Sequence, residues 1–202
     1  MKKIVLATLN ENKIKEIKEI LPDLKDFLVS PQEFSIFSFP EETGKDYREN
    51  AYIKALFVCE KTNLPSIGED SGLEIDFLGG APGIYSARFG GNISFSEKMK
   101  IILEKMKNIP WEERTAEFVC TLAIVLPEKK KEPIFMEGRV KGYIYWEPKG
   151  DSGFGYDPIF YYPEYKCTFG ELTLQEKNKI SHRAKAFLKA RDILKKIIKG
   201  EI

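Results

Sequence analysis

Four groups of polar residues have the types and spacing to carry chemistry. In the first, Thr8, Asn10 and Lys13 place a hydroxyl, an amide and an ammonium in a turn between an apolar run and a helical pattern. Backbone N–H groups at the start of a helix bind anions, and charged donors strengthen that binding. The group could therefore hold a polyphosphate. The same residues could also serve only as helix caps.

Acidic residues form the second group. Glu41 and Glu42 lie in one turn, and Glu69 and Asp70 follow an apolar segment and precede Ser71. Paired carboxylates at the end of a strand can hold Mg²⁺, which takes one or two protein carboxylates and fills its shell with phosphate oxygens and water. The alternative is a solvated acidic loop, which costs nothing to keep in water.

Two glycine-rich stretches form the third group, over residues 79–88 and 152–158. Glycine permits close backbone approach to a flat ligand, and Phe154 could stack on a base, although such stretches can also be ordinary turns. The fourth group is Lys177 with residues 181–183, whose donors suit phosphate or carbonyl oxygens. A histidine beside an arginine at a helix start can equally be a surface cap.

The run Gly150-Asp151-Ser152-Gly153 looks like the sequence around the nucleophile of chymotrypsin-like proteases. In those enzymes the histidine precedes the serine, whereas the one histidine of this chain, His182, follows Ser152. A single histidine also argues against HExxH peptidases and multi-histidine zinc sites. A metal, if used, should therefore be held by oxygen.

Composition limits the partners and the compartment. The 202 residues include 32 lysines and arginines and 31 aspartates and glutamates, so the chain lacks the general basic field that holds proteins on nucleic acid or anionic membranes. Cys59, Cys120 and Cys167 lie outside any CxxC pair, which argues against disulfides and structural zinc. The apolar run near the N-terminus is short, and no apolar run reaches about eighteen residues. We expect a cytoplasmic protein without nucleic-acid or membrane partners.

Strands and helices must position these groups. Residues 3–7 form an apolar run typical of a buried strand. The first helix should follow this strand and end at Pro22, and it should bury one face formed by Ile14, Ile17, Ile20 and Leu21. A second helix is predicted over residues 46–61, and a third begins at a capping box of Ser94 and Glu97.

The second half of the chain predicts a strand pair and a long helix. Residues 115–126 and 134–146 favour antiparallel strands joined by a charged connection over residues 127–133, and the stretches 68–91 and 150–156 are predicted as loops. Thr173 and Glu176 could cap a turn that leads into the last helix. One face of that helix should carry Ala184, Phe187, Leu188 and Arg191, followed by Leu194, Ile197 and Ile198. This order predicts one domain over residues 1–202, an α/β fold around a mixed sheet.

The polar groups belong to motifs that follow one another along the chain in a recognisable order. The motifs are Thr8-x-Asn10-x-x-Lys13, Glu42-Thr43-Gly44, Glu49-Asn50-Ala51 with Lys54-Ala55, Asp70-Ser71-Gly72-Leu73, Gly79-Gly80-Ala81-Pro82-Gly83, Phe154-Gly155-Tyr156-Asp157-Pro158 and Ser181-His182-Arg183. In this order the chain resembles the inosine triphosphate pyrophosphatase family, the house-cleaning enzymes for non-canonical purine nucleoside triphosphates. The resemblance runs from about residue 3 to residue 199.

The resemblance implies an α/β fold with an elongated mixed β-sheet flanked by helices, two lobes with a substrate cleft between them, and a homodimer. It further implies ITP, dITP and XTP as substrates and Mg²⁺ as cofactor. By position, the triphosphate would be held by Thr8, Leu9, Asn10, Glu11, Asn12, Lys13 and Lys54. Asp70 and an acidic residue of the Glu41-Glu42 turn would hold the metal, and Ser71 would also contact substrate. The base pocket would be lined by Phe154, Gly155, Tyr156, Asp157, Lys177, His182 and Arg183.

Two features depart from the family pattern. Leu9 and Asn12 occupy positions that are often glycine in relatives, but the donor groups of the turn are intact. Glu69 occupies a position where relatives often have an aspartate. Whether Glu41, Glu42 or Glu69 completes the metal site with Asp70 is therefore left open.

The expected reaction is hydrolysis to a nucleoside monophosphate and pyrophosphate. Asp70 would bind the metal and act as the base, while Lys13 and Lys54 would clamp the phosphates. Attack at the α-phosphorus makes pyrophosphate the leaving group. His182 and Arg183 would select bases with a 6-oxo acceptor, since adenine would leave their donors unpaired.

Two alternatives belong to other functional classes. A serine hydrolase could use Ser152 or Ser181 with His182, and labelling by a fluorophosphonate probe would favour it. A non-catalytic module could bind nucleotides, and absence of ITP turnover would favour that interpretation.

Overall fold

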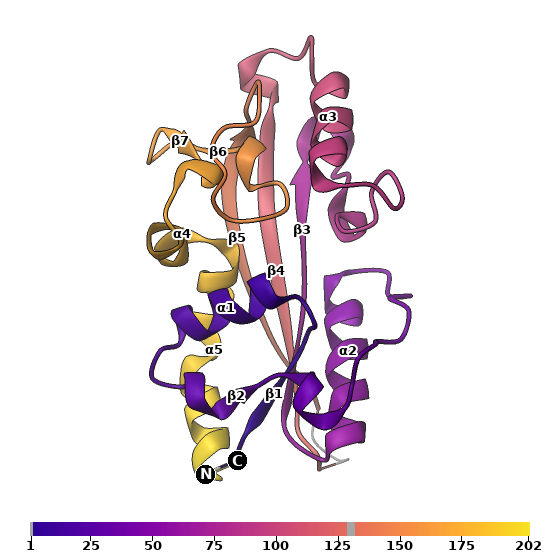
Figure 1. Ribbon diagram of the computed structural model, residues 1–202, viewed down its shortest axis with the longest axis vertical. Helices are drawn as coiled ribbons and strands as arrows, with labels where there is room; N and C mark the ends of the chain where they lie inside the picture. Colours follow the sequence, from indigo (N-terminus) through magenta and orange to yellow (C-terminus); the bar gives the residue numbers. More distant parts are fainter. Residues whose placement is uncertain (1, 129–131) are drawn as a thin grey trace. The chain divides into compact units, whose positions relative to one another are not determined.

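Residues 2–128 and 132–202 are described by a computed structural model, in which five α-helices flank a seven-stranded sheet (Figure 1). The strands are β1 (Ile4–Ala7), β2 (Leu28–Val29), β3 (Ser66–Ile75), β4 (Thr115–Val125), β5 (Ile134–Ile144), β6 (Phe160–Tyr162) and β7 (Cys167–Thr168). The helices are α1 (Glu11–Ile20), α2 (Tyr47–Thr62), α3 (Phe95–Lys105), α4 (Leu174–Ile180) and α5 (His182–Lys199).

The sheet is mixed, with the order β2-β1-β3-β4-β5-β6-β7. β1 pairs in parallel with β2 and β3, whereas β6 pairs antiparallel with β5 and β7. The predicted strand pair is present as the neighbours β4 and β5, and residues 129–131 of the predicted connection lie outside the described residues. The predicted α/β fold around a mixed sheet is confirmed.

The chain packs as two compact units, each with an apolar core of its own. Unit 1 comprises Met1–Asp70, Cys120–Gly138 and His182–Ile202, and unit 2 comprises Ser71–Val119 and Arg139–Ser181. Three strands, β3, β4 and β5, contribute residues to both units.

In unit 1, helices cover both faces of the sheet. Leu6 of β1 packs in one cluster with residues of α1 and α5, whereas its neighbours Val5 and Ala7 pack in another cluster with Val58 of α2. Successive side chains of a strand point to opposite faces, so β1 is buried throughout, as expected for a parallel strand covered on both sides. Figure 1 shows α1 and α5 on one side of these strands and α2 on the other.

In unit 2, α3 packs on the sheet. Met99 and Ile102 of this helix share a core cluster with Leu73, Phe118 and Val140 of the strands. The predicted capping box is present at the start of α3, where Ser94 accepts from the Glu97 backbone N–H and the Glu97 side chain accepts from Ser94. A second capping box, of Thr173 and Glu176, opens α4 as predicted.

The loop predicted over residues 68–91 is wrong over residues 68–75, because these residues belong to strand β3. The local sequence is rich in charge and glycine, which is typical of loops. Glu69 and Asp70 are nevertheless buried, at 3% and 6% exposure, because distant side chains neutralise them. The chemistry predicted for a strand end therefore lies in the middle of a long strand.

The predicted face of α5 is buried except at Leu188 and Arg191. Leu188 is 47% exposed, whereas Ala190 is fully buried between Phe187 and Leu194. A helix turns about 100° per residue, so Leu188 points well away from the face that Phe187 occupies. No helix in the described part of the chain combines the length and apolarity needed to cross a membrane.

Candidate functional site

The turn between β1 and α1 is built by its own polar side chains. Thr8 Oγ1 accepts from the Asn10 backbone N–H at 3.2 Å, and Asn10 Oδ1 accepts from the Lys13 backbone N–H at 3.2 Å. Asn10 is thus the N-cap of α1, in the arrangement expected for an asparagine at this position. Asn10, Glu11 and Asn12 are exposed, so the first turn of α1 faces solvent.

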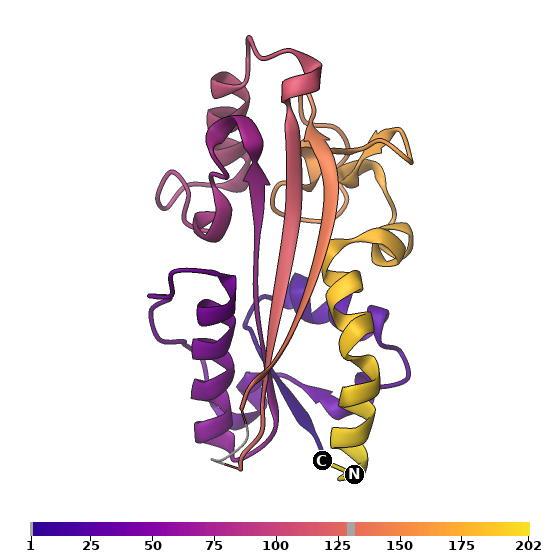
Figure 2. The same cartoon turned by 180° about the vertical axis from the view of Figure 1, so that it is seen from behind.

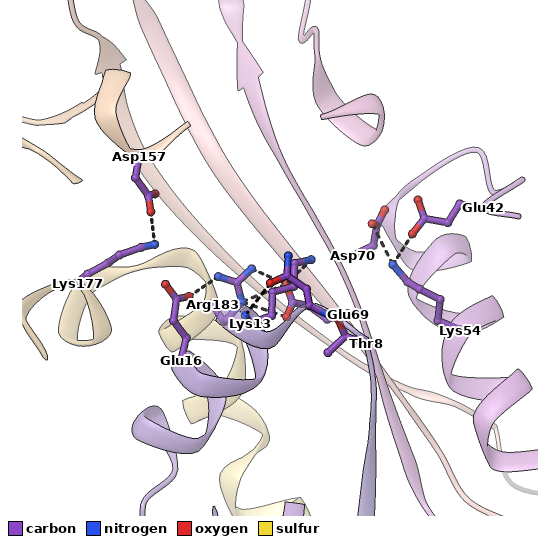
Figure 3. A network of polar contacts seen from close by, with 11 residues as sticks. Thr8, Lys13, Glu16, Glu42, Lys54, Glu69, Asp70, Asp157, Lys177 and Arg183 are labelled. Atoms are coloured by element: carbon purple, nitrogen blue, oxygen red, sulfur yellow. Dashed lines mark hydrogen bonds and ion pairs between the residues drawn. The ribbon is translucent and has the colours of Figure 1, made fainter. Parts of the chain in front are cut away.

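β3 carries Glu69 and Asp70 on opposite faces, because side chains alternate along a strand. Glu69 binds Arg183, whereas Asp70 binds Lys54 (Figure 3). The two neighbouring carboxylates therefore belong to separate polar clusters of unit 1. We call them the Asp70 cluster (Glu42, Asn50, Lys54 and Asp70) and the Arg183 cluster (Lys13, Glu16, Glu69 and Arg183).

The Asp70 cluster brings two carboxylates to one ammonium. Lys54 Nζ lies 2.6 Å from Glu42 Oε1 and 3.3 Å from Asp70 Oδ1. Asn50 Nδ2 donates to Asp70 Oδ2 at 3.2 Å, and Asn50 Oδ1 accepts from the Gly44 backbone N–H at 2.8 Å. One amide side chain therefore connects Asp70 to the turn that carries Glu42.

Close packing of α2 on β3 places these donors. Asn50 and Lys54 are four residues apart and share one face of α2. A Cβ on Gly68 of β3 would overlap the carbonyl oxygen of Ala51 in α2. Glycine at position 68 therefore lets the helix backbone approach the strand, which brings Asn50 and Lys54 to Asp70.

Burial and charge shift the pKa values in the Asp70 cluster. Burial raises the pKa of Asp70; the Lys54 ammonium opposes this, and the Glu42 carboxylate adds to it, so the net shift is upward. Burial alone would lower the pKa of Lys54, but the carboxylates of Asp70 and Glu42 outweigh it and raise that pKa. Lys54 thus stays charged while two carboxylates compete for it.

The carboxylates of the Asp70 cluster are groups that could hold Mg²⁺. Within residues 2–128 and 132–202, no group of three or more His, Cys, Asp or Glu side chains is arranged to hold a metal ion. Mg²⁺ needs fewer protein ligands, since one or two carboxylates suffice when phosphate oxygens and water complete its shell. Glu42 and Asp70 both contact the Lys54 ammonium, and their side chains offer only oxygen ligands. The two carboxylates therefore fit Mg²⁺.

The Arg183 cluster is a buried set of ion pairs. Arg183 is 1% exposed, and its guanidinium donates to Glu69 at 2.7 to 3.1 Å and to Glu16 at 2.5 Å. Lys13 Nζ lies 3.2 Å from Glu69 Oε1. These contacts tie α1, β3 and α5 together beside the turn that carries Thr8 and Asn10 (Figure 3).

The charges of the Arg183 cluster stabilise one another. Burial opposes ionisation of Glu69, but Arg183 and Lys13 outweigh it and hold the pKa of Glu69 well below its usual value. Burial also opposes the charge of Arg183, and the carboxylates of Glu69 and Glu16 outweigh it, so the pKa of Arg183 is well above its usual value. His182, 4% exposed, precedes Arg183 at the start of α5.

A third polar group lies within unit 2. Lys177 of α4, 2% exposed, pairs with Asp157 Oδ2 at 2.5 Å and lies over the Phe154 ring at 4.8 Å from its centroid. Asp157 Oδ2 also accepts from the Phe154 backbone N–H at 2.8 Å. Gly153 has a φ of 74°, and a Cβ there would collide with the Asp157 carboxylate. The predicted residues Phe154, Asp157 and Lys177 thus form one contact group.

The remaining predicted residues have varied surroundings. Tyr156 is 3% exposed, and its hydroxyl donates to the Ser86 carbonyl at 2.9 Å. Glu41 is exposed, whereas Leu9, Ser71 and Gly155 are half-buried. Ser181 is fully buried, and its backbone N–H donates to the Lys177 carbonyl at the end of α4.

Sequence reasoning assigned no role to Asn50 or Glu16. Asn50 could have been found because it is a polar residue on the buried face of α2, one helical turn before Lys54. Glu16 could have been found because it adjoins Ile17 on the apolar side of α1, where it is 2% exposed. A charged residue at such a position needs a partner.

Comparisons with known proteins agree with the motifs. The chain matches the model of the Ham1 family over residues 4–193. It is similar to the dITP/XTP pyrophosphatase of Dictyoglomus thermophilum, with 54% identity over 198 residues that cover 98% of this chain and 96% of that protein. It is also similar to a dITP/XTP pyrophosphatase of Thermus thermophilus, with 45% identity over 91% of this chain and 87% of that protein.

A solved structure shares the fold. The HAM1 protein from Coxiella burnetii matches with a TM-score of 0.88 and 41% identity, over 97% of this chain and 100% of that chain. The resemblance carried by the seven motifs is thereby confirmed. The family model spans nearly the whole sequence, and the relatives match over almost their full lengths. The chain therefore belongs to the Ham1 family.

Proposed function

We propose that this protein hydrolyses the non-canonical purine nucleoside triphosphates ITP, dITP and XTP to the nucleoside monophosphate and pyrophosphate. The observation that carries the proposal is the convergence of Glu42 and Asp70 on the Lys54 ammonium. Similar proteins that are named dITP/XTP pyrophosphatases support the substrate class. The family membership gives no support to the serine hydrolase alternative.

The phosphates would be held by cations and backbone donors of unit 1. A triphosphate carries about four negative charges, which are costly to desolvate without partners. Lys13 and Lys54 supply ammonium groups, and the exposed first turn of α1 supplies N–H groups. Both lysines already contact carboxylates, so they are held in place before a phosphate arrives.

Glu42 and Asp70 would hold Mg²⁺. When bound, the ion would neutralise phosphate charge and favour the ionised form of Asp70. Glu42 is supported as the second carboxylate because it shares Lys54 with Asp70. Glu41 is exposed, and Glu69 is bound by Arg183 and Lys13.

Asp70 would act as the base of the reaction. In its ionised form the carboxylate accepts a proton from water while the water oxygen bonds to the α-phosphorus. The bond between the α-phosphorus and the oxygen that bridges to the β-phosphate breaks, and pyrophosphate leaves with that electron pair. Asn50, which donates to Asp70, would keep the carboxylate oriented.

The purine base would be held by Phe154, Asp157 and Lys177. An aromatic ring offers a stacking surface, and the buried Asp157–Lys177 pair offers both an acceptor and a donor. His182 and Arg183 remain proposed contributors to base selection. Arg183 would act in part through Glu16 and Glu69, which it already binds.

We also propose action in the cytoplasm and a homodimer. The three cysteines are free thiols, in keeping with a reducing compartment. The homodimer follows from the family resemblance.

A matched pair of variants tests the metal ligand. Glu42→Gln should lower kcat/KM by about ten- to a hundredfold and raise the Mg²⁺ concentration needed for half-maximal rate. Glu41→Gln, one residue away and exposed, should change neither by more than about twofold. Equal effects of the two changes would contradict the assignment of Glu42.

Turnover of the purified protein tests the proposal as a whole. ³¹P NMR of ITP, dITP or XTP with Mg²⁺ should show pyrophosphate and a monophosphate as the only products, with ATP a poor substrate. Nucleotide binding without turnover would instead establish a non-catalytic module. Release of inorganic phosphate as the first product would mean a different reaction.

A further inference from the structure

A loop that precedes α3 is attached to its surroundings in unit 2 at two points. It spans residues 83–91 and includes the second half of the glycine-rich stretch 79–88. Figure 2 shows this segment folded beside the start of α3, and Figure 1 gives the same arrangement from the other side. We call this segment the 83–91 loop.

The first attachment is the ammonium of Lys98 in α3. Lys98 is 3% exposed, and its Nζ donates to the carbonyl oxygen of Ala87 at 2.5 Å and to that of Gly91 at 3.3 Å. The ammonium also lies 5.3 Å from the centroid of the Phe95 ring. A buried charge is costly unless hydrogen bonds satisfy it, and here the carbonyl groups of the loop supply them. Lys98 and the loop therefore depend on each other for their placement.

The second attachment is the side chain of Ser86, which is 6% exposed. Its Oγ accepts from the Leu73 backbone N–H of β3 at 2.9 Å and donates to the Gly83 carbonyl oxygen at 2.6 Å. Buried backbone groups need hydrogen-bond partners, and this hydroxyl serves two of them. Ser86 thus fixes the turn at the start of the loop and joins the loop to the sheet.

The loop and α3 together hold Tyr156, which lies in the turn that carries Phe154 and Asp157. The Tyr156 hydroxyl donates to the Ser86 carbonyl oxygen at 2.9 Å. Its ring meets the Phe95 ring edge-on, with 5.2 Å between the centroids. Tyr156 is 3% exposed, so its side chain is buried in these contacts. The position of the turn therefore depends on the position of the loop.

We propose that Lys98 and Ser86 are positioning residues for the purine base. They hold the loop, the loop holds Tyr156, and Tyr156 keeps Phe154 and Asp157 in one geometry before the base arrives. Groups that are ordered in advance lose less conformational freedom on binding, and discrimination by hydrogen bonds depends on such order. The inference rests on the proposed role of Phe154 and Asp157 in holding the base.

Steady-state kinetics with dITP and dATP separate this role from a general loss of structure. Lys98→Met keeps the aliphatic stem and removes the ammonium, so it should raise KM for dITP about tenfold and leave kcat within about twofold. The preference for dITP over dATP in kcat/KM should fall by a similar factor, since both substrates share the triphosphate contacts. Lys100→Met, at an exposed position two residues along α3, is the matched control and should change none of these values.

Two further variants test the route through Tyr156, and they decide the outcome if Lys98→Met does not fold. Ser86→Ala removes the hydroxyl that fixes the loop and should raise KM for dITP, whereas Ser96→Ala, at an exposed position in α3, should not. Tyr156→Phe keeps the ring, removes only the donor to the Ser86 carbonyl oxygen and should raise KM about tenfold. Combined with Lys98→Met it should add little, because both changes break the same connection. Fully additive effects of the two changes would overturn the inference.

Hydrogen exchange reports on the turn without nucleotide or turnover. Mass spectrometry of the free protein should show faster exchange over residues 152–158 in Lys98→Met and Tyr156→Phe than in the wild type, and no change in Lys100→Met. Unchanged exchange, or unchanged KM in variants of an enzyme that hydrolyses dITP, would overturn the inference and leave the proposed function intact. Faster exchange in variants of a protein that does not turn over dITP would refute the proposed function, while the connection between the loop and the turn would stand.

Discussion

Glu69 and Asp70 are neighbours in the chain, but their surroundings shift their pKa values in opposite directions. Arg183 and Lys13 outweigh burial at Glu69 and lower its pKa, whereas burial with the nearby Glu42 raises the pKa of Asp70. A group held firmly in its ionised form stabilises the fold. A group whose charge the fold disfavours is available for metal binding and proton transfer. We therefore propose a structural role for Glu69 and a catalytic role for Asp70.

Replacing each carboxylate by its amide separates these roles. Glu69→Gln leaves Arg183 buried without its main counter-charge and should lower the free energy of unfolding by about 3 kcal/mol. Asp70→Asn should change that free energy by less than about 1 kcal/mol, since the fold disfavours the charge it removes. Asp70→Asn should, however, slow hydrolysis at least about 10³-fold while triphosphate binding persists. Urea denaturation and single-turnover kinetics measure both effects, and retention of a tenth of the activity in Asp70→Asn would refute the assignment of the base.

The pH dependence of stability follows from the lowered pKa of Glu69. A depressed carboxyl pKa contributes stability that is complete above the unfolded value of 4.5 and is lost as the pH falls toward the folded value. The difference in unfolding free energy between wild type and Glu69→Gln should therefore be constant from pH 7 to about pH 5. It should then shrink by up to about 1.4 kcal/mol per pH unit below 4.5. A difference that stays constant down to pH 3 would mean that Glu69 is not held ionised by Arg183.

Among the elements, the contact of α2 with β3 decides the geometry of the Asp70 cluster. Gly68→Ala would place a methyl group on the Ala51 carbonyl oxygen and push α2, with Asn50 and Lys54, away from Asp70. We expect a loss of about 1–3 kcal/mol of stability and a large fall in kcat. Gly79→Ala is the control. Gly79 has a φ of 63° and open space around it, so alanine there should cost only about 1–2 kcal/mol of backbone strain and leave kcat unchanged. Equal falls in kcat for the two variants would contradict this role of Gly68.

Elements with a regular apolar period could be predicted from the sequence, and β3 could not. The faces of α1 and α3 follow from isoleucine, leucine and methionine at helical spacing. β3 contains charge and glycine at its centre, because its partners there are ion pairs and a helix backbone. Such partners come from other parts of the chain, so local periodicity carries no sign of them. The same limit applies to Leu188, whose exposure depends on the surroundings of α5.

At the scale of the whole molecule, the order of the motifs along the chain predicted the candidate residues, and the structure adds the contacts among them. The sequence could name Asp70, Lys54 and the Glu41-Glu42 turn, but the shared ammonium that favours Glu42 is visible only in space. Asn50 lies 20 residues from Asp70, and Glu16 lies 167 residues from Arg183. No spacing rule for a single element connects residues so far apart.

The position of bond cleavage tests the central claim most directly. Hydrolysis of dITP by the purified protein in ¹⁸O-water, followed by mass spectrometry of both products, reports which phosphorus the water attacks. Attack at the α-phosphorus, with Asp70 as base, predicts one ¹⁸O atom in the nucleoside monophosphate and none in pyrophosphate. Label in pyrophosphate or in inorganic phosphate would contradict the proposed reaction and the role given to Asp70.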